Sequence, residues 1–161
     1  MTRCTRATAL VAAALLAASS LTLLQSVRVT SDSMVPTLEP GDRLLLDPRS
    51  ARPSVGDLVV FRQPGTDTLA VKRVVGTAGD TIGLEDGRLR RNGRLVDEPY
   101  VDRDGVEGAE SVHFGPVHVP TGSSFVMGDN RGASVDSRTY GPIEHLRIVG
   151  RVIARVWPLR P

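Results

Sequence analysis

The sequence predicts an all-β domain, a small barrel or curved antiparallel sheet, behind one N-terminal transmembrane helix. Three observations lead to this prediction. Beyond Arg28 the chain consists of short apolar runs separated by Gly, Pro and Asp, dipeptides typical of tight turns lie between them, and no amphipathic helical period of useful length is present.

Five apolar runs have the length and composition of strands, at residues 44–46, 58–61, 71–75, 124–127 and 148–156. Asp86-Gly87 and Asn92-Gly93 are two-residue turn signals and predict a meander of short hairpins. A single helical turn is expected at residues 142–147. Aromatic residues make up only 4% of the chain, so the core has to rely on Val, Leu and Ile.

The membrane helix is predicted from an uncharged N-terminal segment. Residues 7–24 form an Ala/Leu run, which as a helix is about 27 Å long and therefore long enough to span a hydrocarbon core. Arg3 and Arg6 precede the run and only Arg28 follows it, so the positive-inside rule places the N-terminus in the cytoplasm.

A cleavable secretory signal is the alternative interpretation, because Ala17-Ala18-Ser19 has small residues at the offsets of a cleavage site. The apolar run resumes at Leu21 and is longer than a usual signal core, which favours an uncleaved anchor. We therefore expect a cytoplasmic stub and anchor over residues 1–27 and an extracytoplasmic β domain over residues 28–161.

Composition excludes several classes of function. The 20 Lys and Arg residues are balanced by 18 Asp and Glu residues, and no basic stripe is interleaved with aromatics, so nucleic acid is not an expected partner. Cys4 is the only cysteine and has no neighbours of the metal-binding kind. We therefore expect no metal site and no cofactor.

One feature of the basic residues points to chemistry: 19 of the 20 are Arg, and Lys72 is the only Lys. Arg stays protonated in proteins, whereas a buried Lys can release its proton. Strand alternation places Lys72 with Ala70 and Val74, and such apolar neighbours lower the pKa of an amine until it can accept a proton from a serine hydroxyl. The alternative is an edge-strand cation whose head reaches water.

Two further segments hold candidate groups. Ser31 and Ser33 lie just past the apolar run, in a turn that Pro36 stiffens. Residues 128–138 follow a predicted strand and are dense in short hydrogen-bonding side chains, as expected of a loop that keeps a fixed shape. Taken singly, each segment is equally typical of a solvated linker or loop.

Together, the three segments resemble the type I signal peptidases of bacteria, the serine–lysine proteases of family S26. The first matching segment is Ser-Met-Val-Pro-Thr-Leu at 33–38, followed by Gly41-Asp42. The second is Val-Lys-Arg-Val-Val-Gly at 71–76, followed by Gly79-Asp80. The third is Gly-Asp-Asn-Arg at 128–131, followed by Ser134 and by Asp-Ser-Arg at 136–138. Three boxes in this order behind an N-terminal anchor are highly specific.

The resemblance implies that Ser33 is the nucleophile and Lys72 the general base. Ser31 would donate to the oxyanion hole beside the Ser33 backbone N–H, and Ser134 would orient the Lys72 amine. It further implies structural support of the site by Asp129, Asp136 and Arg138, and shallow pockets for small side chains lined by Val29, Met34, Leu38 and Val71.

The implied function is cleavage of signal peptides from secreted preproteins after Ala-x-Ala, through an acyl-enzyme, on the outer face of a bacterial membrane. Ser33 lies six residues beyond Val27, so at most about 21 Å separates it from the anchor, and the lipid bilayer is an expected partner. Two departures from the family pattern are Asp32, where Gly is frequent, and Gly132-Ala133, where a polar pair is frequent.

Other functions compete with this one. A dedicated Ser–Lys peptidase for conjugation or pilus proteins fits the same residues, whereas self-cleaving repressors lack a box like residues 128–138. A Ser-His-Asp hydrolase would need His113, His118 or His145, none of which lies in a Gly-x-Ser-x-Gly setting. The non-enzymatic alternative is a membrane-anchored β module that binds a cell-envelope partner.

Overall fold

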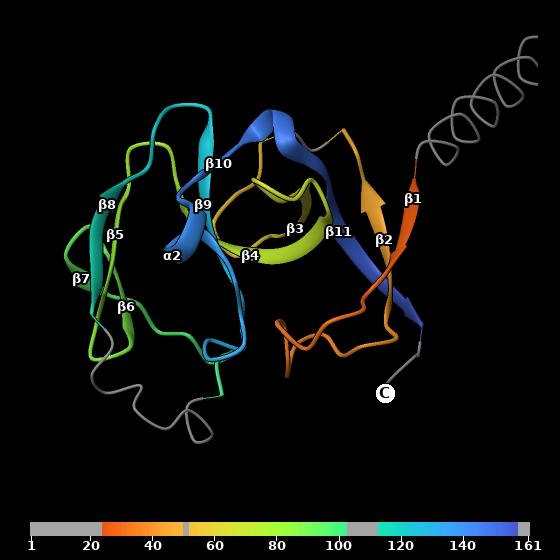
Figure 1. Ribbon diagram of the computed structural model, residues 1–161, viewed down its shortest axis with the longest axis horizontal. Coiled ribbons are helices and arrows are strands. Elements are labelled where there is room, and N and C mark those ends of the chain that lie inside the picture. Colours follow the sequence, from red (N-terminus) through yellow and green to blue (C-terminus); the bar gives the residue numbers. More distant parts are fainter. Residues whose placement is uncertain (1–23, 50–51, 103–112, 158–161) are drawn as a thin grey trace, which may run out of the picture.

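The computed structural model describes residues 24–49, 52–102 and 113–157, and the remaining residues are drawn as a thin grey trace (Figure 1). The described residues contain no helix that is both long and apolar enough to cross a membrane. The predicted anchor and the alternative signal sequence lie almost entirely outside these residues.

A seven-stranded antiparallel sheet forms the larger half of the molecule, in the order β1-β2-β11-β3-β4-β9-β10. Its strands are β1 (Gln25–Arg28), β2 (Arg43–Asp47), β3 (Leu58–Arg62), β4 (Leu69–Thr77), β9 (Ser123–Met127), β10 (Ile143–Glu144) and β11 (Ile148–Trp157). The sheet has two edges in the described part of the chain, β1 and β10, so it is an open curved sheet and not a closed barrel.

A four-stranded sheet stands beside it, in the order β7-β6-β5-β8, on the left in Figure 1. Its strands are β5 (Thr81–Glu85), β6 (Arg88–Arg91), β7 (Arg94–Leu95) and β8 (Phe114–His118). Asp86-Gly87 and Asn92-Gly93 connect the hairpins, and all four residues have positive φ, as a type I′ turn requires. The predicted meander is therefore confirmed.

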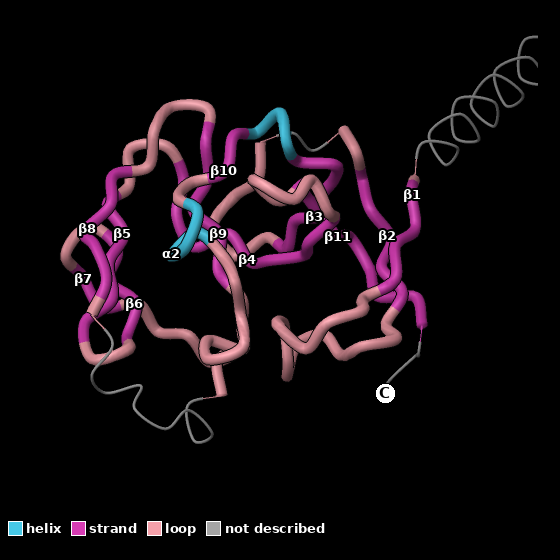
Figure 2. Tube along the Cα trace, in the orientation of Figure 1, coloured by secondary structure: helices cyan, strands magenta, loops and turns pink. Residues whose placement is uncertain are grey.

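Helix is nearly absent from the described residues, as Figure 2 shows. The four-residue helix α2 (Ser137–Tyr140) and the 3₁₀ turn η2 (His145–Arg147) account for it. The fold class predicted from sequence, mostly β and antiparallel, is confirmed. Within the predicted turn at residues 142–147, Ile143–Glu144 is strand β10 and only His145–Arg147 is helical.

The five predicted strands are all present, and the structure extends four of them by one or two residues and the strand at 71–75 by two residues at each end. It adds β1, β8 and β10, which carry too few apolar residues to give a strand signal. The predicted boundary between residues 27 and 28 falls inside β1, where Val27 pairs with Leu44. Pairing with a neighbour makes these residues a strand, because strand formation depends on context more than on composition.

Three apolar clusters make up the core. One lies between the two sheets and includes Ile82, Leu89 and Phe125. Another lies under β3, β4 and β9. The third packs Met34 and Leu38, from the loop between β1 and β2, against the strands on either side of that loop. The loop that carries Ser33 is therefore anchored in the core on both sides of the serine-bearing turn.

We predict that β1 belongs to the folded domain. A chain that begins at Val29 loses the ladder between β1 and β2 and the contact of Val27 with the third cluster, which together contribute about 1–2 kcal/mol. Its thermal midpoint should be roughly 5–10 °C below that of a chain beginning at Gln25. Circular dichroism in the same detergent measures both, and equal midpoints would contradict the assignment of β1 to the sheet.

Candidate active site

Lys72 lies in the interior of the larger sheet, on β4 opposite Val59 of β3. Its side chain is buried, with the residue only 4% exposed. Burial is the main cause that lowers the pKa of Lys72 below its ordinary value of 10.5, and nearby Arg138 lowers it further, whereas Asp136, Asp129 and Asp32 oppose the shift. Burial thus shifts the amine toward its neutral form.

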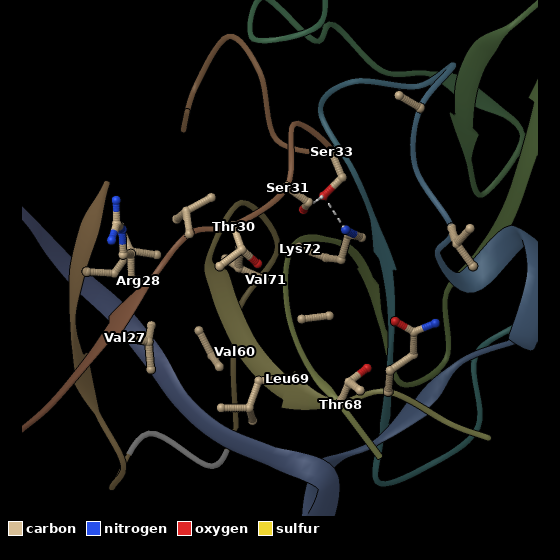
Figure 3. Close-up of a pocket in the computed structure, with 16 residues that line it drawn as sticks. Val27, Arg28, Thr30, Ser31, Ser33, Val60, Thr68, Leu69, Val71 and Lys72 are labelled. Atoms are coloured by element: carbon tan, nitrogen blue, oxygen red, sulfur yellow. Dashed lines mark hydrogen bonds between the residues drawn. The ribbon is translucent and has the colours of Figure 1, made fainter. Parts of the chain in front are cut away.

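Ser33 approaches this amine from the loop after β1. The Nζ atom of Lys72 lies 2.6 Å from Oγ of Ser33, and Ser33 is itself only 5% exposed. The hydroxyl of Ser31 lies 3.2 Å from the Ser33 hydroxyl (Figure 3). A neutral amine in this position can accept the serine proton, which is the requirement for an activated nucleophile.

A pocket of about 650 Å³ opens beside these groups. Ser33 and Lys72 lie at one end of it, and Thr68 and Leu69 lie at the other (Figure 3). Of the four residues predicted to line pockets, Val29 and Val71 line this one.

Met34 and Leu38 do not line the pocket, contrary to the sequence-based expectation. They are 0% and 4% exposed and belong to the third core cluster, together with Leu44 and Leu46. Their side chains point inward and, together with Val29, attach the loop that presents Ser33 to the sheet.

The loop of residues 128–138 holds the other side of the Ser33 turn. The backbone N–H of Asn130 donates to the Ser33 carbonyl oxygen at 3.1 Å, and the Asn130 side chain donates to the Asp32 carbonyl oxygen at 3.3 Å. Gly128 packs so closely that a Cβ atom on it would lie 2.5 Å from the Ser33 carbonyl oxygen. The position of Ser33 therefore depends on the shape of this loop.

Asp136 and Arg138 fix that shape. Asp136 is fully buried, caps α2, and accepts hydrogen bonds from the backbone N–H of Gly128 and from the Arg138 guanidinium. Burial alone would raise the pKa of Asp136, but these hydrogen bonds outweigh it and hold the pKa below 3.8. Arg138 also donates to the carbonyl oxygens of Arg131 and Ser134.

Asp129 is held by Arg73, a residue for which the sequence indicated no role. Two parallel hydrogen bonds, of 2.9 and 2.7 Å, join the Arg73 guanidinium to the buried carboxylate. Arg73 follows Lys72 on β4, so its side chain leaves the opposite face of the strand. The signal that could have suggested this contact is the Lys72-Arg73 pair in one strand, because Arg73 then leaves the face opposite Lys72 and can meet a buried acid such as Asp129.

The hydrogen bond expected between Ser134 and Lys72 is not present in the structure. The Oγ atom of Ser134 is buried and has no hydrogen-bond partner among the described residues, and it faces Gly128. The two departures from the family pattern, Asp32 and Gly132-Ala133, are exposed, and Ala133 lines the pocket.

The three histidines lie away from Ser33. His145 is 3.0 Å from Oγ of Ser124, but this serine is fully buried in β9 and cannot meet a substrate. His113 lies 3.6 Å from Asp86 of the smaller sheet, and His118 is in β8. No group of acidic, His or Cys side chains in the described ranges could hold a metal ion.

Several known proteins are similar to this chain. The family model described as "Signal peptidase, peptidase S26" matches residues 2–157. The chain is 34% identical to a signal peptidase I of Leptolyngbya laminosa, over 81% of this chain and 68% of the relative. It is 40% identical to a signal peptidase I of Bacillus licheniformis, over 80% of this chain and 74% of the relative.

Longer relatives and a solved structure are also similar. Thylakoidal processing peptidase 1 of Arabidopsis thaliana is 35% identical over 81% of this chain, which spans only 41% of that protein. The crystal structure of a signal peptidase I from Enterococcus faecalis V583 superposes with a TM-score of 0.57 and 28% identity. The match covers 64% of this chain and 97% of that structure.

We predict that Gly128→Ala destabilises the domain by about 1–3 kcal/mol, since the added methyl group meets the Ser33 carbonyl and the Ser134 hydroxyl. Urea unfolding of both variants measures the change. Ser134→Ala is the comparison: it removes a buried hydroxyl without a partner and should be neutral or stabilising. If Ser134→Ala costs more than Gly128→Ala, the described position of Ser134 is wrong.

A second prediction concerns pH and stability. At a pH below the lowered pKa of Lys72, its amine is charged in both the folded and the unfolded chain, and folding has to bury the ammonium. Between that pKa and 10.5 the unfolded chain binds the extra proton, so wild-type stability rises with pH. Lys72→Met should therefore be most stabilising at low pH, with its advantage shrinking as pH rises through this window. Unfolding curves across pH test this, and a pH-independent difference would contradict the burial argument.

Proposed function

Because this chain belongs to the signal peptidase family, peptidase S26, we propose that it cleaves signal peptides from secreted preproteins with Ser33 as nucleophile and Lys72 as general base. The observation that carries the assignment of residues is the 2.6 Å contact between the buried Lys72 Nζ atom and the Ser33 Oγ atom. Burial lowers the pKa of Lys72 and so favours the neutral amine that such a base requires.

The first half of the reaction forms an acyl-enzyme. The Ser33 oxygen attacks the carbonyl carbon of the scissile peptide while Lys72 takes the hydroxyl proton. The oxyanion that forms accepts hydrogen bonds from the Ser33 backbone N–H and from Ser31, whose hydroxyl lies beside the nucleophile. Lys72 then gives its proton to the departing amine as the C–N bond breaks.

The second half regenerates the enzyme. Lys72 removes a proton from a water molecule, which attacks the acyl carbon. Collapse of the intermediate releases the signal peptide with a new carboxyl group, and the proton returns to Ser33. Asp129, Asp136 and Arg138 act as structural support, through the contacts that hold residues 128–138 against the Ser33 turn.

The substrates are preproteins with small residues before the cut, of the Ala-x-Ala type. This proposal is supported by the pocket beside Ser33, which Val29 and Val71 line. Two relatives of this chain carry the name signal peptidase I.

The enzyme would be held in the membrane by one helix, with its N-terminus in the cytoplasm and the β domain outside. The Ala/Leu run of residues 7–24 ends immediately before β1. Since the sheet begins at Gln25, the anchor would end near residue 24 and not at 27. Eight residues of strand and turn then separate it from Ser33, which keeps the site close to the bilayer surface.

Lys72→Arg tests the proposed base most directly. Arg keeps the positive charge but does not release its proton near neutral pH, so no cleavage of a model preprotein should be detectable. In the wild type the rate should rise with pH through the lowered pKa of Lys72 and then level off. Gel assays with sequencing of the new N-terminus provide the measurement.

Two serine variants provide the controls for this experiment. Ser33→Ala should also abolish cleavage, whereas Ser31→Ala should retain activity lowered by about 10²–10³-fold. Normal turnover by Lys72→Arg would rule out Lys72 as the base. If a variant without the three histidines lost the rise of the rate with pH, that rise would have to be assigned to a histidine and not to Lys72.

A further inference from the structure

A buried ion pair outside the proposed dyad joins Glu98 to Arg131. The Glu98 side chain is fully buried and that of Arg131 is 8% exposed. One guanidinium nitrogen donates to Oε2 of Glu98 at 3.0 Å and the other donates to Oε1. Burying two charges costs about as much as their attraction returns, so such a pair is weak evidence for a role in stability alone.

Arg131 extends this pair toward the active site. Its Nε atom donates to the Gly128 carbonyl oxygen at 3.0 Å. The N–H of Gly128 binds Asp136, and the N–H of Asn130 binds the carbonyl of Ser33. The turn at residues 128–130 is thus attached to Glu98 on one side and to the serine loop on the other.

Tyr100 ties the same segment to the second arginine of the site. Its hydroxyl donates to Oε1 of Glu98 at 3.1 Å, and burial raises the pKa of Tyr100, which keeps the hydroxyl protonated. The Arg73 guanidinium lies 3.9 Å from the centre of the Tyr100 ring while binding Asp129. Residues 98–100 therefore contact both arginines that flank the turn at 128–130.

We propose that Glu98 is a positioning residue for the reaction at Ser33: through Arg131 it fixes the turn at residues 128–130 and thereby the place of Ser33 relative to Lys72. This inference rests on the proposed function. Glu98 does not line the substrate pocket, so its loss should lower kcat and leave KM nearly unchanged. A displacement of about 1 Å at a reacting group is enough to slow a reaction roughly 100-fold.

The test is Glu98→Gln in the full-length enzyme in detergent micelles. Gln keeps the size of the side chain, but its amide nitrogen is a donor facing a guanidinium donor, so one of the two hydrogen bonds is lost. With a fluorogenic peptide carrying Ala-x-Ala before the scissile bond, kcat should fall about 10- to 100-fold. KM should stay within about twofold of the wild type, because the binding surface is unchanged.

Glu85→Gln is the matched control, because it makes the same substitution in an exposed ion pair with Arg90 in the smaller sheet. It should retain wild-type kcat and KM. The double variant Glu98→Gln/Arg131→Met should be no slower than Arg131→Met alone, since Glu98 acts through Arg131. The proposal would be overturned if the fold-losses of kcat in the two single variants multiplied in the double variant. It would also be overturned by a wild-type kcat in folded Glu98→Gln.

Two further variants keep the outcome decisive. If Glu98→Gln does not fold, Tyr100→Phe replaces it: a kcat roughly three- to tenfold lower at unchanged KM supports the proposal, and wild-type kcat overturns it. Ser33→Ala, assayed in parallel, separates the two levels of inference. Cleavage by Ser33→Ala would refute the proposed function itself, whatever the result for Glu98.

Discussion

The candidate active site is organised around the burial of one amine, that of Lys72, beside one hydroxyl, that of Ser33. Lys72 is 4% exposed, and its Nζ atom is 2.6 Å from Oγ of Ser33. A protonated amine in that place lacks water, so its charged form is destabilised and its pKa falls. Lys72 is on β4, which lies between β3 and β9 inside the sheet, and this position keeps the amine buried.

Nearby carboxylates oppose the lowering of the Lys72 pKa, and the arginines of the site offset the negative charge of these carboxylates. Asp136 and Asp129 both raise the pKa of Lys72, while Arg138 lowers it. Each carboxylate is bound by an arginine, Asp136 by Arg138 and Asp129 by Arg73. The same contacts that hold the loop of residues 128–138 in shape therefore offset negative charge near the amine. Arginine suits this task because it remains protonated when it is buried.

The smaller sheet supports the site without lining it. Its strands share the core cluster around Ile82 and Phe125 with β4 and β9 of the larger sheet. The chain that leaves β7 carries Glu98 and Tyr100 back to the two arginines beside the turn at residues 128–130. Residues 98–100 are thus joined through Arg131 to the turn at 128–130, about thirty residues later in the chain, and neither segment lines the pocket.

The mostly β fold, the five apolar strands, both hairpin turns and the Ser33 and Lys72 segments could all be predicted from the sequence. These are local features, set by alternation, turn residues and motif order. Tertiary structure alone decided that Gln25–Arg28 is a strand, that Met34 is core and not pocket, and that Ser134 faces Gly128. It also decided which arginine binds which acid. Such contacts join residues far apart in the chain, and their choice depends on packing and burial, which no local pattern records.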